Sequence, residues 1–478
     1  MTPTDRELRS LVTRGIARMR HDWGRIEKVD RYVRGKHDDP YMPTTASPEY
    51  RRLAKRAVTN FLPLIVSTPA QAMAVNGFRH KGADSDAVAP EWVVWQRNRM
   101  DSRQHAVHRA ALQFGSAYVA VLPGEDGQPE IRGASPRQMY AEYDDPVNDA
   151  LPLWALQVER LPEPTTRDVT RAWLYTPTHV YEYSVTLEGA GSATEVARME
   201  HGVTLDGKPV CPVVRFAQDV DLEGRVTGVV WPLIPIQDKV NQTVFDLLIA
   251  QTFGSFKVRT ITGMAPEIET DADGNPIYDE NGRPKARPIR ADASRFMVAP
   301  DPDTKFGTLD ETPLDGFLSA IEAGVRQMSV ISQTPPHYLL GSIVNLSAEA
   351  LAAAEAALTR AVREYQDAYG ESWELVLALA GALLGQPYDR EAQISWMDHE
   401  SRSLAQTVDA LGKAVQMLQV PPRELWSKIP GVTEGDVERW KATADEQDTM
   451  TRMAERMAEA LRRPSMKEPT DEDRSTAP

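Results

Sequence analysis

The sequence contains almost no cysteine. Cys211 is the only one among 478 residues, so no disulfide can form within the chain, and packing must hold the fold together. This is usual for a protein made in a reducing cytoplasm. The strand-like sequence VCPVVRF around Cys211 predicts an inert buried thiol and not a nucleophile.

Long hydrophobic runs are also missing. The longest, LVLALAGALLG at 375–385, is about half of the roughly 20 residues that a membrane-spanning helix needs. The first residues, MTPTDRELRSLVTRG, are charged from residue 5 onward and lack the apolar segment of a secretory signal. These absences predict a soluble protein that does not associate with a membrane.

Positive charge is in deficit. The chain has 54 Lys and Arg against 69 Asp and Glu, which gives a net charge of −15. This sign argues against tight DNA binding, which depends on the neutralisation of phosphates. It is compatible with a surface past which DNA moves without sticking, and equally with many ordinary cytoplasmic proteins. The length by itself predicts about three domains.

Motifs for catalysis are absent or incomplete. GVTLDGKP at 202–209 has the G-x-x-x-x-G-K spacing of a phosphate-binding loop, but Pro209 occupies the position of the hydroxyl that binds magnesium. The residues that follow, VCPVV, have the pattern of a strand, whereas such a loop must lead into a helix. We therefore expect a hairpin turn at Asp206 and Gly207, and no enzymatic activity.

Asp271, Asp273 and Asn275 resemble the beginning of a calcium loop. Glycine follows at the fourth position instead of the sixth, and Pro276 interrupts the pattern. These departures predict a simple turn, with no bound metal ion.

Asp101, His105 and His108 have the spacing that places three ligands on one face of a helix. The H-E-x-x-H core of zinc enzymes is absent, and no cysteine lies near. A solvated helix face is the expected structure here, and we expect no metal or other cofactor.

Helical periodicity dominates the chain. It predicts helices at 5–35, from 51 to Asn76 and Gly77, at 90–116, 236–255, 314–331 and from an N-cap at Ser347 through the alanine-rich segment to 384, with shorter helices near 402–418, 422–428 and 434–461. Short β-branched and aromatic runs between Tyr118 and Phe216 predict an antiparallel β-rich region. The fold class is therefore α+β, predominantly helical. No internal repeat is apparent.

A turn-rich insertion separates the helices at 236–255 and 314–331. Residues 257–312 contain the turn signals DADGNP and DENGRP, which favour a small β-domain. Its basic residues are suited either to contact phosphate or an acidic partner, or to keep a strand edge solvated: Arg283, Lys285, Arg287 and Arg290. The alanine-rich helix after Ser347 is compatible with core packing, a coiled-coil arm or a subunit contact.

Several segments together resemble the portal proteins of siphovirus-type tailed phages. They are YVRGKH, VNGFR, HRAALQFGSAYVAV, GKPVCPVVRF, WPLIPIQDKVNQTVFDLLIAQTFGSFKVRTITG with Asp238 and Asn241, TPPHYLLG followed by Asn345, SAEAL, and IPGVTEGDVERW. The similarity covers roughly residues 25–445. The sequence departs from the family at Gly228, Val229, Val230, Trp231 and Pro232, where the family usually has G-x-S-E-I.

The resemblance implies a cyclic homo-oligomer of about twelve subunits at one vertex of the capsid. The implied regions are 1–235 as wing, 236–256 and 313–332 as stem helices, 257–312 as clip, 333–346 as tunnel loop, 347–395 as tunnel helix and wing return, 396–461 as crown, and 462–478 as a disordered tail. Such a ring would form the channel through which double-stranded DNA is packaged and ejected, without sequence specificity. It would be assembled in the host cytoplasm and remain in the virion.

The resemblance also implies site residues and partners. The tunnel loop residues that would face DNA are Gly341, Ser342, Ile343, Val344 and Asn345. Basic residues that either face the channel or form lateral ion pairs between subunits are Lys239, Lys257 and Arg326. The four basic residues of the clip would contact the terminase large subunit or the head-tail adaptor. Major capsid and scaffold proteins are the other expected partners.

Two other functions compete with a portal. One is a nucleotide-dependent enzyme that uses the loop at 202–209, and the other is a capsid-associated structural scaffold without a channel. Hydrolysis of ATP that depends on Lys208 would favour the enzyme, and the absence of rings would favour the scaffold.

Overall fold

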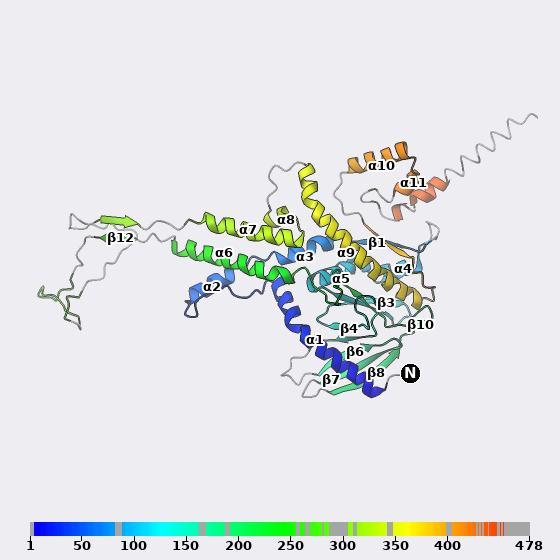
Figure 1. Cartoon of the computed structure of the whole chain (residues 1–478), viewed down its shortest axis with the longest axis horizontal. Helices are drawn as coiled ribbons and strands as arrows, with labels where there is room; N and C mark the ends of the chain where they lie inside the picture. Colours follow the sequence, from blue (N-terminus) through cyan, green and yellow to red (C-terminus); the bar gives the residue numbers. More distant parts are fainter. Residues whose placement is uncertain are drawn as a thin grey trace, which may run out of the picture. The chain divides into compact units, whose positions relative to one another are not determined.

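The computed structural model describes residues 4–81, 88–161, 169–186, 192–254, 259–262, 268–279, 282–285, 305–308, 313–341, 348–397 and 404–426, with short stretches between 429 and 453. The chain forms two compact units. The larger unit contains Met1–Arg34, Phe61–Ile234 and Ser329–Pro478, and the smaller unit contains Gly35–Asn60 and Pro235–Met328. The expected α+β class is confirmed (Figure 1).

Helices provide much of both units. They are α1 (Asp5–Val33), α2 (Pro48–Arg56), α3 (Leu62–Gln71), α4 (Pro90–Arg97), α5 (Met100–Phe114), η1 (Trp231–Leu233), α6 (Ile234–Gly254), α7 (Asp315–Ser332), α8 (Pro336–Leu340), α9 (Ala348–Leu383), α10 (Leu404–Leu418) and α11 (Pro422–Leu425). Within the described ranges, no helix is both long and apolar enough to cross a membrane.

The strands all pair in antiparallel fashion. They are β1 (Val75–Arg79), β2 (Ala117–Pro123), β3 (Pro129–Ala134), β4 (Met139–Glu142), β5 (Trp154–Val158), β6 (Val169–Tyr175), β7 (His179–Thr186), β8 (Ser192–Glu200), β9 (Thr204–Leu205), β10 (Lys208–Pro209), β11 (Val213–Phe216), β12 (Arg259–Thr262), β13 (Lys305–Thr308) and β14 (Gln393–Trp396). The sheets have the orders β4-β5-β6-β7-β8, β11-β2-β3, β1-β14, β9-β10 and β12-β13. The β-rich region expected between Tyr118 and Phe216 is confirmed.

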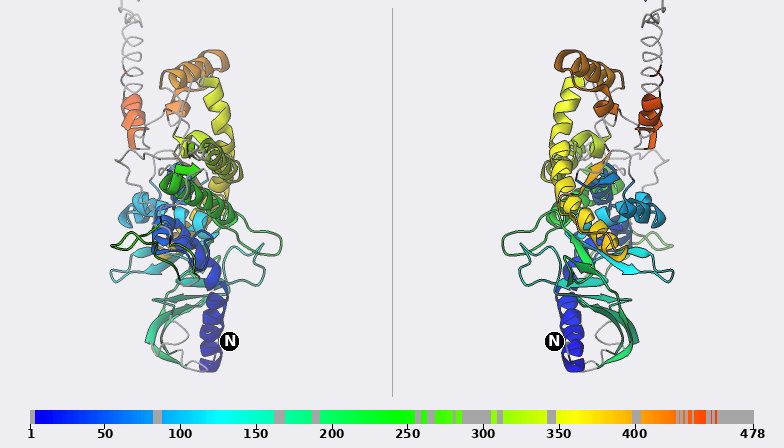
Figure 2. Two further views of the ribbon diagram at one scale, coloured as in Figure 1. Left: turned by 90° about the vertical axis from the view of Figure 1, so that its left-hand side faces the viewer. Right: turned by 90° about the vertical axis from the view of Figure 1, so that its right-hand side faces the viewer.

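Helix α1 covers the five-stranded sheet, as Figure 2 shows in blue against green. The helix begins with a capping box, in which Thr4 and Glu7 satisfy each other's backbone N–H groups. Its apolar stripe, which includes Leu8, is buried against the sheet. A Cβ atom at Gly15 would lie 2.7 Å from a methyl group of Leu156, so the absence of a side chain lets the helix approach the sheet closely.

Buried aromatic rings join helix α9 to the three-stranded sheet and to α4 and α5. Trp373 of α9 packs edge-on against Phe216 of β11 at 4.5 Å between ring centroids, and against Trp95 of α4 at 4.9 Å. Tyr369, one turn earlier on α9, stacks on His108 of α5 at 5.4 Å. Edge-on and offset-stacked pairs of this kind add to the stabilisation from apolar burial. The cluster is one of the buried cores of the larger unit.

The helix expected from residue 51 to Gly77 is wrong, because the structure divides this region into α2, α3 and β1. Helix α2 ends at Arg56 and α3 begins at Leu62. The last residues, Val75–Arg79, form a strand because they pair with β14, which lies more than three hundred residues later in the chain. The strand β14 was itself not expected, and a short strand of this kind is specified mainly by its distant partner.

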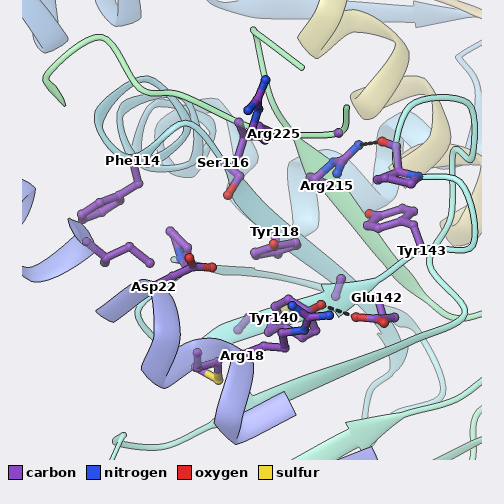
Figure 3. Close-up of a pocket in the computed structure, with 18 of the residues that line it drawn as sticks. Arg18, Asp22, Phe114, Ser116, Tyr118, Tyr140, Glu142, Tyr143, Arg215 and Arg225 are labelled. Carbon is purple, nitrogen blue, oxygen red and sulfur yellow. Dashed lines mark hydrogen bonds between the residues drawn. The ribbon is translucent and has the colours of Figure 1, made fainter. Parts of the chain in front are cut away.

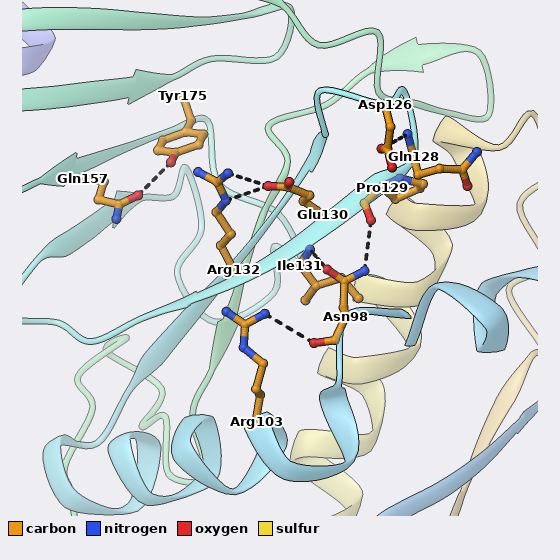
Figure 4. Close-up of polar contacts among 10 residues, drawn as sticks. All are labelled: Asn98, Arg103, Asp126, Gln128, Pro129, Glu130, Ile131, Arg132, Gln157 and Tyr175. Carbon is orange, nitrogen blue, oxygen red and sulfur yellow. Dashed lines mark hydrogen bonds and ion pairs between the residues drawn. The ribbon is translucent and has the colours of Figure 1, made fainter. Parts of the chain in front are cut away.

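The helix expected at 90–116 is interrupted. Helix α4 ends at Arg97 and α5 begins at Met100, because Arg99 has a left-handed backbone with φ of 54°. Figure 4 shows how Asn98 holds this break against strand β3. Its side-chain amide donates to the Pro129 carbonyl at 3.0 Å and accepts from the Ile131 N–H at 3.0 Å. The break between α4 and α5 therefore places Asn98 where it satisfies backbone groups of strand β3 that have no partner on that side among the described strands.

The alanine-rich segment forms a single helix. Helix α9 has 36 residues and continues through Gly370, as expected from its composition. Ser347, the expected N-cap, lies outside the described residues. The helices expected at 402–418 and 422–428 are confirmed as α10 and the shorter α11. Beyond them, residues 435–437 and 439–446 are helical, and the expected tail at 462–478 lies outside the described residues.

Candidate functional site

The two helices expected on either side of the insertion are present. Helix α6 has 21 residues, which makes a rod of about 30 Å, and α7 has 18. They run side by side in opposite directions (Figure 1). A Cβ atom at Gly324 would lie 2.7 Å from Cγ2 of Val240, so the glycine permits the close packing of α7 on α6. The smaller unit is thus built around an antiparallel helix pair with a connecting segment.

A buried polar network anchors the segment Gly35–Asn60 to α6. Gln237 and Asn241 have exposed fractions of 0% and 2%. The side chain of Gln237 donates to the carbonyl of Thr59 at 2.6 Å, and Oδ1 of Asn241 accepts from the N–H of Thr59 at 3.2 Å. The other end of Asn241 lies 2.7 Å from Nδ1 of His37. Buried amides with partners of this kind fix one arrangement of the chain.

The network was not expected as a structural feature. The apolar spacing of 236–255 places hydrophobic side chains toward the core, yet two polar residues four positions apart lie there as well. That i, i+4 pair of amides within an apolar stripe was the available signal. Apolar packing completes the anchor, because Phe245 of α6 is buried with Leu53, Ala54 and Ala57.

Two of the three basic residues expected near the channel lie on the described parts of the helices. Lys239 is exposed on α6 and approaches Oε1 of Gln327 on α7 at 3.4 Å. Arg326 is exposed on α7 and pairs with Glu322 at 3.3 Å, one turn away on the same helix. Lys257 lies outside the described residues. Both side chains are thus exposed to solvent in the single chain.

The described part of the insertion contains turns and short strands. Oδ1 of Asp271 accepts from the N–H groups of Asp273 and Asn275, so the expected turn is confirmed. The same D-x-x-G-x-P pattern recurs at 279–284 with an equivalent turn. The two turn signals of the sequence therefore form turns of one kind.

Backbone hydrogen bonds join the residues that flank the two turns. Ile277 donates to the carbonyl of Glu269, Lys285 donates to that of Ile277, and Glu269 donates to that of Lys285, each at 2.8 Å. The side chains of Lys285 and Glu269 also form an ion pair of 2.8 Å. Arg283 is exposed, whereas Arg287 and Arg290 lie outside the described residues. Of the four basic residues expected to contact partners, one is thus already paired within the chain.

The segment expected to be the tunnel loop begins with a short helix. Helix α7 ends at Ser332, and the next residue, Gln333, has a left-handed backbone with φ of 53°. Helix α8 then begins with Pro336 in its first turn. Gly341 terminates α8 with φ of +67°, a conformation that favours glycine. The other four tunnel-loop residues, Ser342, Ile343, Val344 and Asn345, lie outside the described residues.

The segment at 202–209 is a hairpin, as expected. Strands β9 and β10 pair with Leu205 opposite Lys208. Asp206 and Gly207 between them have φ of 50° and 73°, which is typical of the tight turns that connect hairpin strands. A strand follows the loop where phosphate binding would need the first turn of a helix.

The expectation of a solvated face for Asp101, His105 and His108 is wrong for His108, whereas Asp101 is exposed and His105 is partly exposed. His108 is completely buried, because this side of α5 packs against α9. The three side chains have separate partners: Oδ1 of Asp101 accepts from the Trp95 indole, His105 contacts the carbonyl of Ala70, and His108 accepts from the Trp373 indole. Among the described residues, no group of three or more His, Cys, Asp or Glu is arranged to hold a metal ion.

Cys211 is buried, as expected, with an exposed fraction of 1%. Its Sγ donates to the carbonyl of Tyr175 at 3.7 Å. Burial raises the pKa of the thiol well above its usual value, which keeps the thiol protonated. A protonated, enclosed thiol is a poor nucleophile.

Comparison with known proteins supports one family. A family model described as phage portal protein, SPP1 Gp6-like, matches residues 14–450. The portal protein of Mycobacterium phage D29 is 26% identical over 404 residues, which cover 81% of this chain and 79% of that protein. The portal protein of Mycobacterium phage L5 is 26% identical over 378 residues, covering 76% and 73%.

Two solved structures are also similar to the chain. One is a chain from the virion of a native gene transfer agent particle, with a TM-score of 0.42 and 13% identity over 84% of this chain and all (100%) of that chain. The other comes from the neck of an empty gene transfer agent particle, with a TM-score of 0.42 and 11% identity over 81% and 94%. The family match extends over most of the sequence and includes both helices of the antiparallel pair. The chain therefore belongs to the SPP1 Gp6-like family of phage portal proteins.

Proposed function

We propose that the chain is one subunit of a ring of about twelve copies, with α6 and α7 surrounding a central channel for double-stranded DNA. The antiparallel helix pair, closely packed at Gly324 and joined by a turn-rich segment, is the observation that carries this proposal. Two rods of this kind from each copy provide the wall of a channel, and the connecting segments gather at one end. DNA enters the capsid through this channel and later leaves through it.

The proposal assigns a role to each region. We propose 1–235 as wing, 236–256 and 313–332 as stem, 257–312 as clip, 333–346 as tunnel loop, 347–395 as tunnel helix and wing return, and 396–461 as crown. The segment Gly35–Asn60, which packs on α6 through Asn241, braces the stem within each subunit. The clip is the docking site for the terminase large subunit and for the head-tail adaptor.

Large apolar residues are exposed along α7. Leu318, Val330 and Ile331 have exposed fractions of 50%, 77% and 52%. They point in different directions around the helix, since successive residues are about 100° apart. In the ring, the neighbouring subunit covers Leu318 of the smaller unit.

The charge of the chain suits passage of DNA. With a net charge of −15, the subunit offers few cations to phosphates, and each strong phosphate contact would slow transport. Lys239 and Arg326 are the exposed stem cations, and in the ring they either face DNA or pair with the next subunit. Ion pairs between subunits compete for the same charges, as Glu322 already does for Arg326.

Electron microscopy of the purified full-length chain at micromolar concentration tests the proposal. We expect rings with a central hole, in which α6 and α7 line the channel at subnanometre resolution. The variant Leu318→Asp should reduce ring assembly, whereas Leu222→Asp, at an exposed apolar residue of the larger unit, serves as control. Monomers without rings would contradict the channel and favour a scaffold role.

The enzyme alternative is tested separately. ATP hydrolysis that is lost in Lys208→Ala would assign catalysis to the loop at 202–209 and contradict a purely structural role. We expect no hydrolysis by either protein, because Lys208 lies on a hairpin. Capsids that contain the chain should package DNA only when terminase supplies the motor.

A further inference from the structure

A cavity of about 680 Å³ lies within the larger unit, and nothing in the proposed portal function uses it. It opens between α1, strands β2 and β4, and the loop that precedes η1 (Figure 3). Its volume is within the range of pockets that hold small molecules. Four arginines line it although the chain as a whole is acidic: Arg18, Arg25, Arg215 and Arg225. The cavity is therefore a local concentration of cationic side chains.

Two of these arginines are held in place without losing their charge. Arg25 donates to the carbonyl of Val226 at 3.0 Å, and Arg215 donates to that of Pro146 at 2.6 Å. The Arg215 guanidinium also lies 4.4 Å from the ring centroid of Tyr143, a cation–π contact. A guanidinium has five N–H donors, and a carbonyl partner leaves the positive charge uncompensated. Both groups are thus oriented cations with donors to spare.

Arg225 differs from them in its partners. Its guanidinium forms ion pairs of 2.7 Å with Asp221 and with Glu223. Two carboxylates already neutralise this cation, so it has little to offer an anion in the cavity. Substitution of Arg225 therefore serves as a control for substitutions of Arg25 and Arg215 in binding measurements.

The hydroxyl of Tyr143 supplies a second, independent observation. It is buried and has no hydrogen-bond partner among the described residues. Burial raises the pKa of this phenol well above its usual value, so the hydroxyl remains a neutral donor. A buried donor without an acceptor is unfavourable and is rare in native proteins. An acceptor atom of a bound molecule would remove this penalty.

The carboxylates of the cavity limit what can bind. Glu142 accepts a hydrogen bond from Tyr140, which occupies one of its oxygens but leaves its charge. Asp22 lies on α1 between Arg18 and Arg25 in sequence, and no ion pair joins it to either one within the described part of the chain. Apart from Arg225 and its two carboxylates, three arginines face two carboxylates, Asp22 and Glu142, so the site keeps an excess of positive charge. The charge of Asp22 repels an anion placed nearby.

We propose that this cavity binds a small phosphate-bearing molecule, whose oxygens accept hydrogen bonds from Arg25, Arg215 and Tyr143. Phosphate is favoured over a simple carboxylate because it presents more acceptor oxygens to several converging donors, and guanidinium groups match its geometry. The site is separate from the stem, and it needs neither the ring nor DNA. It is a binding site, with no chemical step assigned.

Isothermal titration calorimetry of the full-length protein tests the proposal. The probes are inorganic phosphate, pyrophosphate, adenosine monophosphate and, as a carboxylate control, succinate. We expect saturable binding of at least one phosphate compound and none of succinate. Comparison of pyrophosphate with the nucleotide distinguishes a free phosphate ligand from one carried on a nucleoside.

Substitutions locate the bound molecule. Arg25→Gln and Arg215→Gln should each weaken binding about tenfold, since each removes charge-assisted hydrogen bonds. Asp22→Asn should strengthen binding several-fold because a repulsive charge is lost. Arg225→Gln, the matched control, should change the dissociation constant by less than about twofold.

Tyr143→Phe separates binding from folding. The hydroxyl has no hydrogen-bond partner in the described structure, so its removal should keep or raise the melting temperature of the unliganded protein while weakening binding several-fold. The proposal is overturned if no phosphate compound binds at millimolar concentration, if succinate binds equally well, or if Arg225→Gln and Arg215→Gln have equal effects.

Discussion

The indole Nε1 of Trp373 donates a 2.9 Å hydrogen bond to Nε2 of His108, and both side chains are completely buried. Because Nε2 is the acceptor, the imidazole must be neutral, with its proton on Nδ1. Burial, helped by the nearby charge of His105, lowers the pKa of His108 from 6.5 to about 3. The contact that joins α9 to α5 therefore depends on an uncharged histidine.

Acid should weaken the larger unit through His108. Between pH 6.5 and about 3, His108 takes up a proton in the unfolded chain but not in the folded one. The unfolded state then binds more protons, so the free energy of unfolding falls as pH decreases, by up to about 1.4 kcal/mol per pH unit. His108→Gln keeps an acceptor for Trp373 without a titration in this range, and should flatten that slope in thermal melts from pH 7 to 4.

The exposed His21 of α1 provides a control for this experiment. His21→Gln removes one imidazole from the surface, so it gives the reference against which the effect of His108→Gln is compared. An identical pH dependence in the parent protein and His108→Gln would show that protonation of His108 does not limit stability in acid.

Removal of the Asn241 amide should loosen Gly35–Asn60 from α6. Asn241→Ala removes the acceptor of the Thr59 N–H and one acceptor of the buried Gln237 amide, which costs about 2 kcal/mol. Limited proteolysis should then cut within residues 38–47 faster than in the parent protein. Gln242→Ala, one residue away and only partly buried, removes the contact with the exposed Tyr41 and should have a smaller effect. Equal cleavage rates for all three proteins would rule out the anchoring role.

The two glycines of α7 should respond in opposite ways to alanine. At Gly324 a Cβ atom would lie 2.7 Å from Val240, so Gly324→Ala should destabilise the α6–α7 pair by about 1–3 kcal/mol. At Gly316 a Cβ atom would meet nothing within 4 Å, and the substitution should stabilise the helix by up to about 1 kcal/mol. Chemical denaturation and hydrogen exchange of α6 measure both effects. Destabilisation of similar size at both positions would contradict close packing at Gly324.

Arg137 should matter more for stability than other paired arginines. Its guanidinium reaches Asp30 and Glu27 of α1 at 2.9 Å each, and only 27% of the side chain is exposed. Arg137→Ala leaves the largely buried Asp30 with fewer partners and should cost about 2 kcal/mol. Arg132, paired with Glu130 on β3 (Figure 4), has 68% of its side chain exposed, so Arg132→Ala should cost less than about 1 kcal/mol. Denaturant unfolding followed by tryptophan fluorescence compares the two, and equal losses would refute the ranking.

The sequence alone predicted the features that depend on local interactions. Apolar spacing placed α1, α6, α7 and α9 within a few residues of their observed ends, because a long helix with one apolar face is specified by neighbours in sequence. The hairpin at Asp206 and Gly207 was predictable for the same reason, since two adjacent residues can adopt the required backbone. Family resemblance, in turn, came from the order of these pieces.

Tertiary structure decided what local patterns left open. Val75–Arg79 became a strand because β14 supplies its hydrogen bonds from far along the chain, and the break at Arg99 is held by contacts between Asn98 and β3. His108 became a buried neutral base only because Trp373 of a distant helix covers it. In the pair formed by α6 and α7, the two contributions can be told apart. Its two rods were determined by the sequence of each helix, whereas Gly324, Gln237 and Asn241 acquired their roles from segments that only folding brings into contact.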